Sequence, residues 1–342
     1  MNRTVKELRL LCKEKRIKNY TKMNKKELQK ELQKELQKEL KVVEKELKVV
    51  EKKEDIGEKK ETKKIVKIGI HVFKGNDMAN SIKEAKSKCP LNAVQIFTHG
   101  PRSTRQVNHD YKAIKKETSD IHLYVHSSYP TNPWNGKPEI INHTIDQFVS
   151  SKLLGAKGVV LHIPKLNPKK VSKTVKKLVE ALNEKKILEG QKIILEMKAV
   201  KQHPTESYES PEKINRLIET LRKDGMSESQ VGICIDTAHI YAGKADIHTH
   251  TQGVEYFKKL KYPEWIALFH INGNVYDVKK RAGDKHAVPL DEEDKVWKGL
   301  KYKDSGCRAF IEYAVSKKID LIVEIKDHHT YKHINDFVDK IT

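Results

Sequence analysis

Short apolar runs alternate with helical patterns from residue 65 to the end of the chain. Runs of four to eight residues rich in Val, Ile and Leu are typical of parallel strands with helices over both faces. Such runs predict strands at residues 65–72, 93–97, 121–126, 158–162, 193–196, 231–236, 265–270 and 320–324. The stretches between them predict helices at residues 76–88, 138–154, 168–187, 211–223 and 305–317.

Eight strand–helix units in about 275 residues have the size of a TIM (β/α)8 barrel. An open, doubly wound sheet is the alternative. The open sheet is disfavoured because no Gly-rich phosphate loop follows the first strand. It is also disfavoured because each of the last six strands ends on a residue that can hold a metal ion. These are His126, His162, Glu196, Asp236, His270 and Glu324. Only a closed barrel gathers six strand ends around one centre.

Three further candidates for metal binding lie just past strand ends: His239, Asp284 and His286. The full set of five His, two Asp and two Glu is too large for one ion and suits a cluster. Imidazole nitrogen with carboxylate oxygen favours zinc, with manganese second. Any one of these residues alone is more often structural, as a core or rim histidine or as a carboxylate paired with a lysine. Their joint arrangement predicts a metal centre.

Residues 1–33 predict two short helices around an extended turn. Thr4 can cap a first helix whose Val5, Leu8 and Leu11 share a face, and a second helix begins at Lys25. The segment resembles the helix–extended–helix modules of the SAP and Rho N-terminal type, which bind nucleic acid. A charged helical hairpin without a ligand is the alternative.

Residues 34–64 predict a charged helical linker, and residues 65–342 the barrel. Leucines at 28, 32, 36 and 40 recur every four residues, which overshoots the 3.6-residue turn. Their stripe therefore winds around the helix and forms no coiled-coil seam. We interpret this helix as a solvated spacer that ends near Gly57.

The charge of the chain points to an anionic partner. The net charge is +21 and the isoelectric point is about 9.5. Residues 1–26 carry ten Lys and Arg against two Glu, whereas residues 27–64 carry twelve Lys against eleven acids. Nucleic acid is the commonest partner of so basic a chain, and a Lys-rich solubilising surface is the alternative.

The cysteines and the hydropathy pattern predict a soluble intracellular protein. The four cysteines stand far apart without a CxxC pair, as in proteins of reducing compartments. No apolar stretch has the length of a membrane span, and the polar N-terminus lacks a signal-peptide core. We expect a monomer that is not secreted and has no membrane partner.

Five motifs carry a family resemblance. Residues 231–239 read VGICIDTAH, residues 126–129 read HSSY, and residues 270–272 read HIN; segments 68–72 and 97–102 also match. Over residues 67–342 the chain resembles endonuclease IV, the zinc-dependent apurinic/apyrimidinic endonuclease built on a TIM barrel. All nine metal positions of that family have a counterpart of the right type.

The resemblance implies three zinc ions and a DNA-repair activity on duplex DNA with abasic sites. It assigns His126, His162 and Glu196 to a first zinc; Glu196, Asp236, His270 and Glu324 to a second; and His239, Asp284 and His286 to a third. Glu196 and Glu324 are the expected catalytic carboxylates. Cleavage on the 5′ side of the lesion leaves a 3′-hydroxyl and a 5′-deoxyribose phosphate. Arg102 and Tyr129 match positions that contact DNA, and a surface Arg and a packed Tyr are the plainer interpretation.

The loops around the ligands depart from the family. Its E-N-T-A-G is EMKAV at 196–200, its H-P-G is HIPK at 162–165, and its H-L-N-D is HING at 270–273. After His286 the family's H-S-L-G-E-G is replaced by AVPLD. Lys165 and Lys198 are therefore new cations near the rim, which either touch phosphate or coat the surface.

Two other functions fit part of the pattern. A sugar isomerase or epimerase of the xylose isomerase-like superfamily needs one Mn or Mg, and Glu196, Asp236, His270 and Glu324 could hold it. That interpretation leaves five ligands and the basic N-terminus unexplained. A zinc-bound DNA-binding protein without turnover is the second alternative, suggested by the altered loops.

Overall fold

The computed structural model of the chain describes residues 4–5, 8–9, 12, 17, 19–32, 34, 66–73, 77–103, 107, 109–164, 167–198, 208–278, 283–325 and 336. The chain divides into two compact units, Met1–Lys63 and Lys64–Thr342. All nine predicted metal ligands belong to the second unit.

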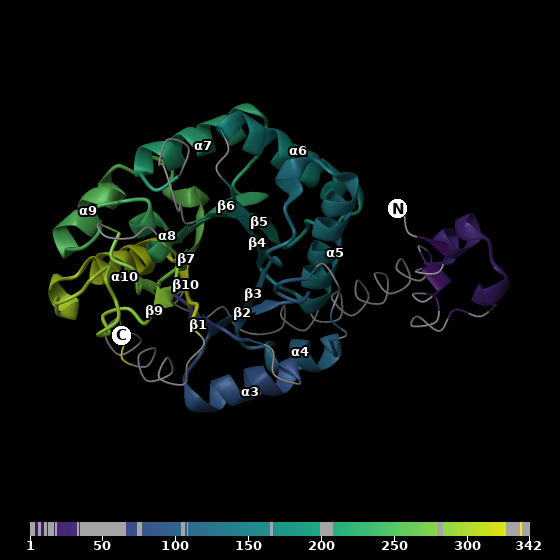
Figure 1. Ribbon diagram of the computed structural model, residues 1–342, viewed down its shortest axis with the longest axis horizontal. Coiled ribbons are helices and arrows are strands. Elements are labelled where there is room, and N and C mark those ends of the chain that lie inside the picture. The colour runs from purple at the N-terminus through teal and green to yellow at the C-terminus, as the bar shows by residue number, and fades with distance from the viewer. Residues whose placement is uncertain are drawn as a thin grey trace, which may run out of the picture. The chain divides into compact units, whose positions relative to one another are not determined.

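The second unit is a closed barrel of eight parallel strands, which confirms the predicted TIM barrel. The strands follow one another around the barrel in the order β1-β10-β7-β6-β5-β4-β3-β2, and helices surround them (Figure 1). Their bounds are β1 (Ile68–His71), β2 (Ala93–Phe97), β3 (His122–His126), β4 (Gly158–Ile163), β5 (Lys192–Met197), β6 (Val231–Asp236), β7 (Ile266–His270) and β10 (Asp320–Val323).

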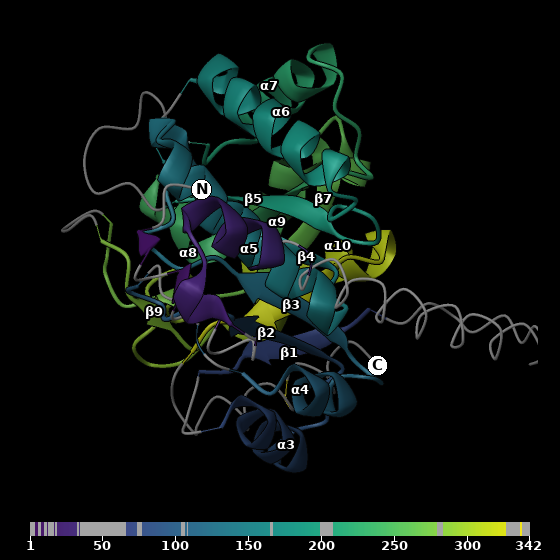
Figure 2. The same cartoon turned by 90° about the vertical axis from the view of Figure 1, so that its right-hand side faces the viewer.

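The helices that cover the barrel are α3 (Met78–Lys88), α4 (Tyr111–Glu117), α5 (Pro138–Leu154), α6 (Pro168–Glu184), α7 (Pro211–Lys223), α8 (Thr237–Ala242), α9 (His250–Lys258) and α10 (Gly306–Lys317). Helices α6 and α7 pack side by side (Figure 2). A two-stranded antiparallel hairpin, β8 (Gly273–Asn274) and β9 (His286–Ala287), follows β7.

Capping side chains explain where several helices begin. Asn167 and Ser210 accept hydrogen bonds from backbone N–H groups of the first turns of α6 and α7, and a proline opens each helix. The helix predicted from residue 76 begins instead at Met78, because Asp77 accepts from the N–H groups of Ala79 and Asn80. The strand predicted at 65–72 is shorter, and the helix predicted to reach residue 187 ends at Glu184.

Side chains inside the barrel form layers, because alternate residues of a strand point to the same face. The central layer is one buried cluster with one residue from each of seven strands: Ala93, Tyr124, Val160, Ile194, Cys234, Leu268 and Ile322. The residues two positions further along these strands form the next layer, at the carboxyl ends. That layer contains six of the predicted metal ligands together with Gln95.

The first unit has a small apolar core of its own. Leu8, Cys12, Leu28 and Leu32 are buried against one another. Asn24 caps the helix that begins at Lys25, through reciprocal hydrogen bonds between Asn24 and Glu27.

The predicted face of the first helix is wrong in part. Leu8 is buried, but Val5 is 36% exposed, and Leu11 lies outside the described residues. Leu28 and Leu32 belong to this core and not to a solvated stripe; Leu36 and Leu40 lie outside the described residues. In the part of the chain that the structure describes, no helix combines the length and apolarity needed to cross a bilayer.

Candidate metal centre

The structure brings all nine predicted metal ligands together at the carboxyl ends of the barrel strands. His126, Asp236 and His270 are the last residues of β3, β6 and β7. His162 and Glu196 lie near the ends of β4 and β5, and Glu324 directly follows β10. His239 lies in α8, His286 in β9, and Asp284 two residues before His286.

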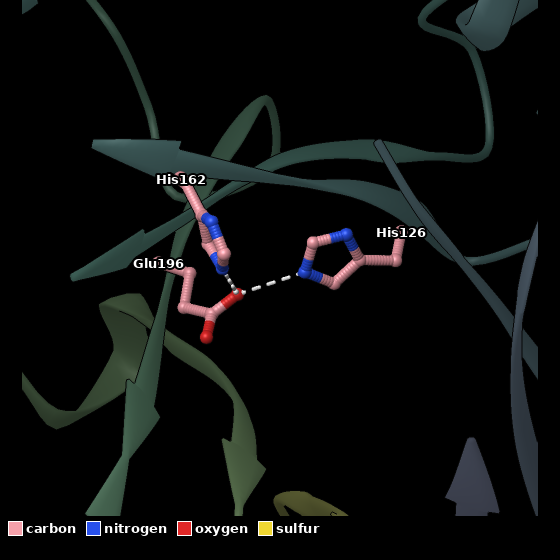
Figure 3. Close-up of side chains that lie close together, drawn as sticks. All are labelled: His126, His162 and Glu196. Carbon is pink, nitrogen blue, oxygen red and sulfur yellow. Dashed lines mark hydrogen bonds and ion pairs between the residues drawn. The ribbon is translucent and has the colours of Figure 1, made fainter. Parts of the chain in front are cut away.

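Glu196 lies at the centre of the first group (Figure 3). Its Oε2 is 3.2 Å from His126 Nε2 and 3.1 Å from His162 Nε2. His162 reaches it from β4, which pairs with β5, and His126 from β3, the next strand beyond β4. Glu196 is fully buried, so a carboxylate has been placed where water cannot solvate it.

The second group shares Glu196. Its Oε1 is 3.3 Å from His270 Nδ1, which lies 3.2 Å from Glu324 Oε2 and 3.7 Å from Asp236 Oδ2. Three carboxylates therefore surround one imidazole nitrogen. Glu196, Asp236, His270 and Glu324 form a cluster that could hold a metal ion.

Asp284 joins the two histidines of the third group. His239 Nε2 is 3.2 Å from Asp284 Oδ2, and His286 Nε2 is 3.1 Å from Asp284 Oδ1. His286 Nε2 also lies 3.7 Å from Asp236 Oδ2, so Asp236 faces both this group and the second.

The separations fit a metal with short bonds to nitrogen and oxygen. Ligand atoms at the corners of a tetrahedron with bonds of about 2.0–2.1 Å are about 3.3 Å apart. Six His–carboxylate separations of 3.1–3.3 Å in the three groups agree with that edge, whereas the two to Asp236 are longer, at 3.7 Å. Nitrogen and carboxylate oxygen are also the donors that zinc takes.

Histidines and carboxylates in the site stabilise each other's charged forms. Burial raises the pKa of the Glu196 carboxyl, but His162 and His270 outweigh it and hold the pKa well below the ordinary value. Burial lowers the pKa of His286, yet Asp236 and Asp284 raise it to about 9. Burial raises the pKa of the Cys234 thiol to about 12, so this neighbour of His270 stays a neutral thiol.

Hydrogen bonds to the protein hold the imidazole rings in place. His126 Nδ1 donates to Ser127 O at 2.7 Å, and His239 Nδ1 donates to Met197 O at 2.6 Å. In both rings Nε2 is then left to face a carboxylate. Metal-binding histidines commonly donate their other nitrogen to a carbonyl group in this way.

Three polar residues of the site were missed by the sequence analysis. Asn272 Nδ2 donates to Asp236 Oδ2 at 2.7 Å, and its Oδ1 accepts from Glu324 N at 2.8 Å. Gln95 donates to Glu324 Oε1 at 2.6 Å and to His71 Nδ1 at 2.9 Å. A signal existed, because His71 and Gln95 are polar residues inside apolar strand runs.

Tyr129 and Arg102 lie on neighbouring loops at the mouth of the barrel. The backbone N–H of Tyr129 donates to Pro101 O at 2.9 Å and so joins the loops after β2 and β3. The Tyr129 side chain is 56% exposed although its ring stacks on His162, with centroids 5.9 Å apart. Arg102 is exposed. Tyr129 is therefore not a packed core residue.

Of the two new rim cations, Lys198 is exposed and Lys165 lies outside the described residues. Lys198 is two positions beyond Glu196. The glycine that replaces the family's Asp in H-L-N-D has a structural reason. A Cβ on Gly273 would lie 2.6 Å from the carboxyl carbon of Asp294, which occupies that space.

Comparison with known proteins shows the family to which the barrel belongs. Residues 82–304 match the family of the xylose isomerase-like TIM barrel. Over 250 residues the chain is 30% identical to a probable AP endonuclease of African swine fever virus (isolate Tick/Malawi/Lil 20-1/1983), covering 69% of this chain and 79% of the relative. It is also 30% identical over 220 residues to a probable endonuclease 4 of Staphylococcus epidermidis (strain ATCC 12228 / FDA PCI 1200), covering 60% and 72%. Endonuclease IV from Thermus thermophilus superposes with a TM-score of 0.60 at 19% identity, covering 80% of this chain and 99% of that chain, which is a likeness of fold.

Proposed function

The chain belongs to the xylose isomerase-like TIM barrel family, and we propose that it is a DNA-repair endonuclease that hydrolyses the phosphodiester on the 5′ side of abasic sites in duplex DNA. The observation that carries the proposal is the convergence of five histidines and four carboxylates at metal-ligand separations. The viral and bacterial relatives support it, since they are named as AP endonuclease and endonuclease 4.

We assign about three zinc ions to the centre. His126, His162 and Glu196 would hold the first, and Glu196, Asp236, His270 and Glu324 would hold the second. His239, Asp284 and His286 would hold the third, with Asp236 Oδ2 3.7 Å from His286 Nε2. Glu196 would serve both the first and the second group, because its Oε2 faces the first and its Oε1 the second.

Divalent ions, when bound, supply positive charge where the phosphodiester gains negative charge in its transition state, and they lower the pKa of water. The chain contributes the arrangement. Glu196 and Glu324 would position the ions around the scissile phosphate. Asn272 hydrogen-bonds to the Asp236 carboxylate and to the backbone N–H of Glu324, and so fixes these two residues relative to each other. A water oxygen bonds to phosphorus, the bond from phosphorus to the 3′-oxygen breaks, and that oxygen takes a proton. The products are a 3′-hydroxyl and a 5′-deoxyribose phosphate.

Arg102 and Tyr129 are proposed to contact the DNA beside the lesion. The exposed Tyr129 ring stands over His162 at the mouth of the site. An exposed aromatic ring can stack on a base or fill the gap that a missing base leaves. Arg102, on the loop bonded to Tyr129, can pair with a phosphate.

A sugar isomerase or epimerase remains the second candidate. The cluster of Glu196, Asp236, His270 and Glu324 would suffice for the one Mn or Mg of such an enzyme. An isomerase or epimerase function assigns no role to the close contacts of Asp284 with His239 and His286. Metal analysis separates the two: about three zinc per chain supports the nuclease, whereas one manganese or magnesium supports the isomerase.

The direct test is cleavage of a duplex that contains one tetrahydrofuran abasic analogue. We expect a single cut on the 5′ side of the analogue and loss of the activity on prolonged chelation. A folded, zinc-loaded protein that binds this duplex and leaves it intact would contradict the proposal. It would favour instead a DNA-binding protein without turnover.

A further inference from the structure

Gln95 is a fully buried glutamine in the layer of the barrel that holds the metal ligands. It lies two positions after Ala93 of the central layer, so its side chain points into the barrel at the depth of Glu196 and His270. Its strand, β2, supplies none of the nine ligands. Nevertheless its amide makes three hydrogen bonds inside the site.

The partners of Gln95 fix the orientation of its amide. Nε2 lies 2.6 Å from Glu324 Oε1 and 2.9 Å from His71 Nδ1, whereas Oε1 lies 3.0 Å from His270 Nε2. A carboxylate accepts hydrogen bonds and cannot donate them. If the amide were flipped, its oxygen would meet a carboxylate oxygen at hydrogen-bond distance and repel it. The amide nitrogen must therefore face Glu324, and the oxygen must face His270.

This orientation decides which nitrogen of His270 can bind a cation. Because Gln95 Oε1 only accepts, His270 Nε2 carries a hydrogen, so Nδ1 is the nitrogen that can give up its proton and offer a lone pair to a cation. Nδ1 is the nitrogen that faces the carboxylates, 3.3 Å from Glu196 Oε1 and 3.2 Å from Glu324 Oε2. The same amide holds Glu324 Oε1, so Oε2 of that carboxylate is turned toward the centre.

We propose that Gln95 is a positioning residue for the metal centre: one buried amide selects the Nδ1-binding tautomer of His270 and orients Glu324. The inference rests on the metal binding in the proposed function and not on DNA cleavage. Gln95 touches two ligands of the second group, so its loss weakens that group first.

The test is Gln95→Met, which keeps the length of the side chain and removes its hydrogen bonds. Gln191→Met is the matched control. Gln191 is also a buried glutamine, but its amide donates to the backbone oxygens of Phe148 and Ile187, away from the site. In the full-length protein, zinc affinity is measured by competition with a chromophoric chelator. Histidine side chains are followed by 15N NMR in the zinc-loaded state.

We expect Gln95→Met to lower the zinc affinity of one site by about 10- to 100-fold, the usual effect of losing a partner of a metal ligand. The exchange-protected Nε2–H signal of His270, assigned by its absence in His270→Asn, should disappear. Gln191→Met should change neither measurement, although it costs stability.

A folded Gln95→Met protein with zinc affinities within about twofold of wild type and an unchanged His270 signal would overturn the inference. A wild-type protein that binds zinc but does not cut DNA contradicts the proposed function alone.

Discussion

Glu196 is the residue on which most of the site converges. Its two oxygens lie 3.1–3.3 Å from nitrogens of four histidines that belong to four different elements. Glu196→Gln keeps the size of the side chain but removes the charge that holds two cations close together. We expect cleavage of abasic DNA to be abolished while the circular dichroism spectrum is retained.

Glu189→Gln is the control for this change, because Glu189 is an exposed residue whose nearest cation, Lys152, lies 3.7 Å away. It should leave the rate unchanged. If Glu196→Gln kept more than about a tenth of the wild-type rate, corresponding to ~1.4 kcal/mol of barrier, Glu196 would not be a bridging ligand.

Tyr129 tests the assignment of the DNA-binding face. Tyr129→Ala removes the exposed ring, and stacking of a base on an aromatic side chain is worth about 1–3 kcal/mol. We expect weaker binding of abasic duplex by about 5- to 160-fold, measured by fluorescence anisotropy, with zinc content unchanged. Tyr129→Phe keeps the ring and should bind like wild type. Equal losses in the two variants would show that the hydroxyl, and not stacking, makes the contact.

The residues that converge at the site were predictable from the sequence where a strand ended on them, whereas the polar residues that hydrogen-bond to them were not predicted. An apolar run that stops at His, Asp or Glu marks the carboxyl end of a barrel strand, which gave His126 and Glu196 directly. Gln95 and His71 lie inside such runs or at other strand positions that the search for terminal His, Asp and Glu did not include, so they were not found. Alternate residues of a strand point to the same face. Because Ala93 lies in the central layer, the side chain two positions later, Gln95, also points into the barrel.

At the scale of elements, the apolar runs predicted every barrel strand, and the errors in these strands lie at their ends. Helices α4, α8 and α9 were not among the predicted helices. Strand 65–72 was predicted too long: β1 spans Ile68–His71, although Val72 N still donates to Gln95 O of β2 at 2.8 Å, and Ile65 lies outside the described residues. The hairpin of β8 and β9 was not predicted. It spans two residues on each side, too few for any periodicity to appear.

Asp294 stabilises the loop that carries β8 and β9. The buried carboxylate accepts from three backbone N–H groups: Oδ1 from Val296 at 2.8 Å and Asn274 at 3.2 Å, and Oδ2 from Leu290 at 2.9 Å. Asp294→Asn would set a side-chain N–H against one of these donors. Leaving a buried donor unsatisfied costs about 1–3 kcal/mol, and we expect that loss in urea unfolding.

Asp246→Asn is the matched control, because Asp246 is exposed, and it should change the free energy of unfolding little. Gly273→Ala should also destabilise the loop, since the added carbon would meet the Asp294 carboxyl at 2.6 Å. Asp294→Asn with wild-type stability would mean that the loop does not depend on these bonds.

At the scale of the whole molecule, the chain combines a barrel with a basic first unit that has its own core. Leu8, Cys12, Leu28 and Leu32 bury one another within Met1–Lys63. Residues 1–26 carry ten Lys and Arg against two Glu. The fold of this unit could be predicted only in part, because the same leucines suit a solvated helix and a small core. Its proposed role in nucleic-acid binding rests on charge and resemblance.

Deletion of residues 1–63 tests that role. The barrel should fold and cleave without them, because its core and all nine ligands lie in Lys64–Thr342. DNA affinity should fall, and so should its dependence on salt, since each lost phosphate contact lowers the slope of log K against log[salt] by roughly 0.9 for B-DNA. Loss of three or four contacts would lower the slope by about 3, while turnover at saturating DNA stays close to that of the full chain. A truncated protein with the affinity and salt slope of the full chain would assign the first unit to a spacer or to a protein partner, because charge that touches phosphate cannot be removed without changing the salt dependence.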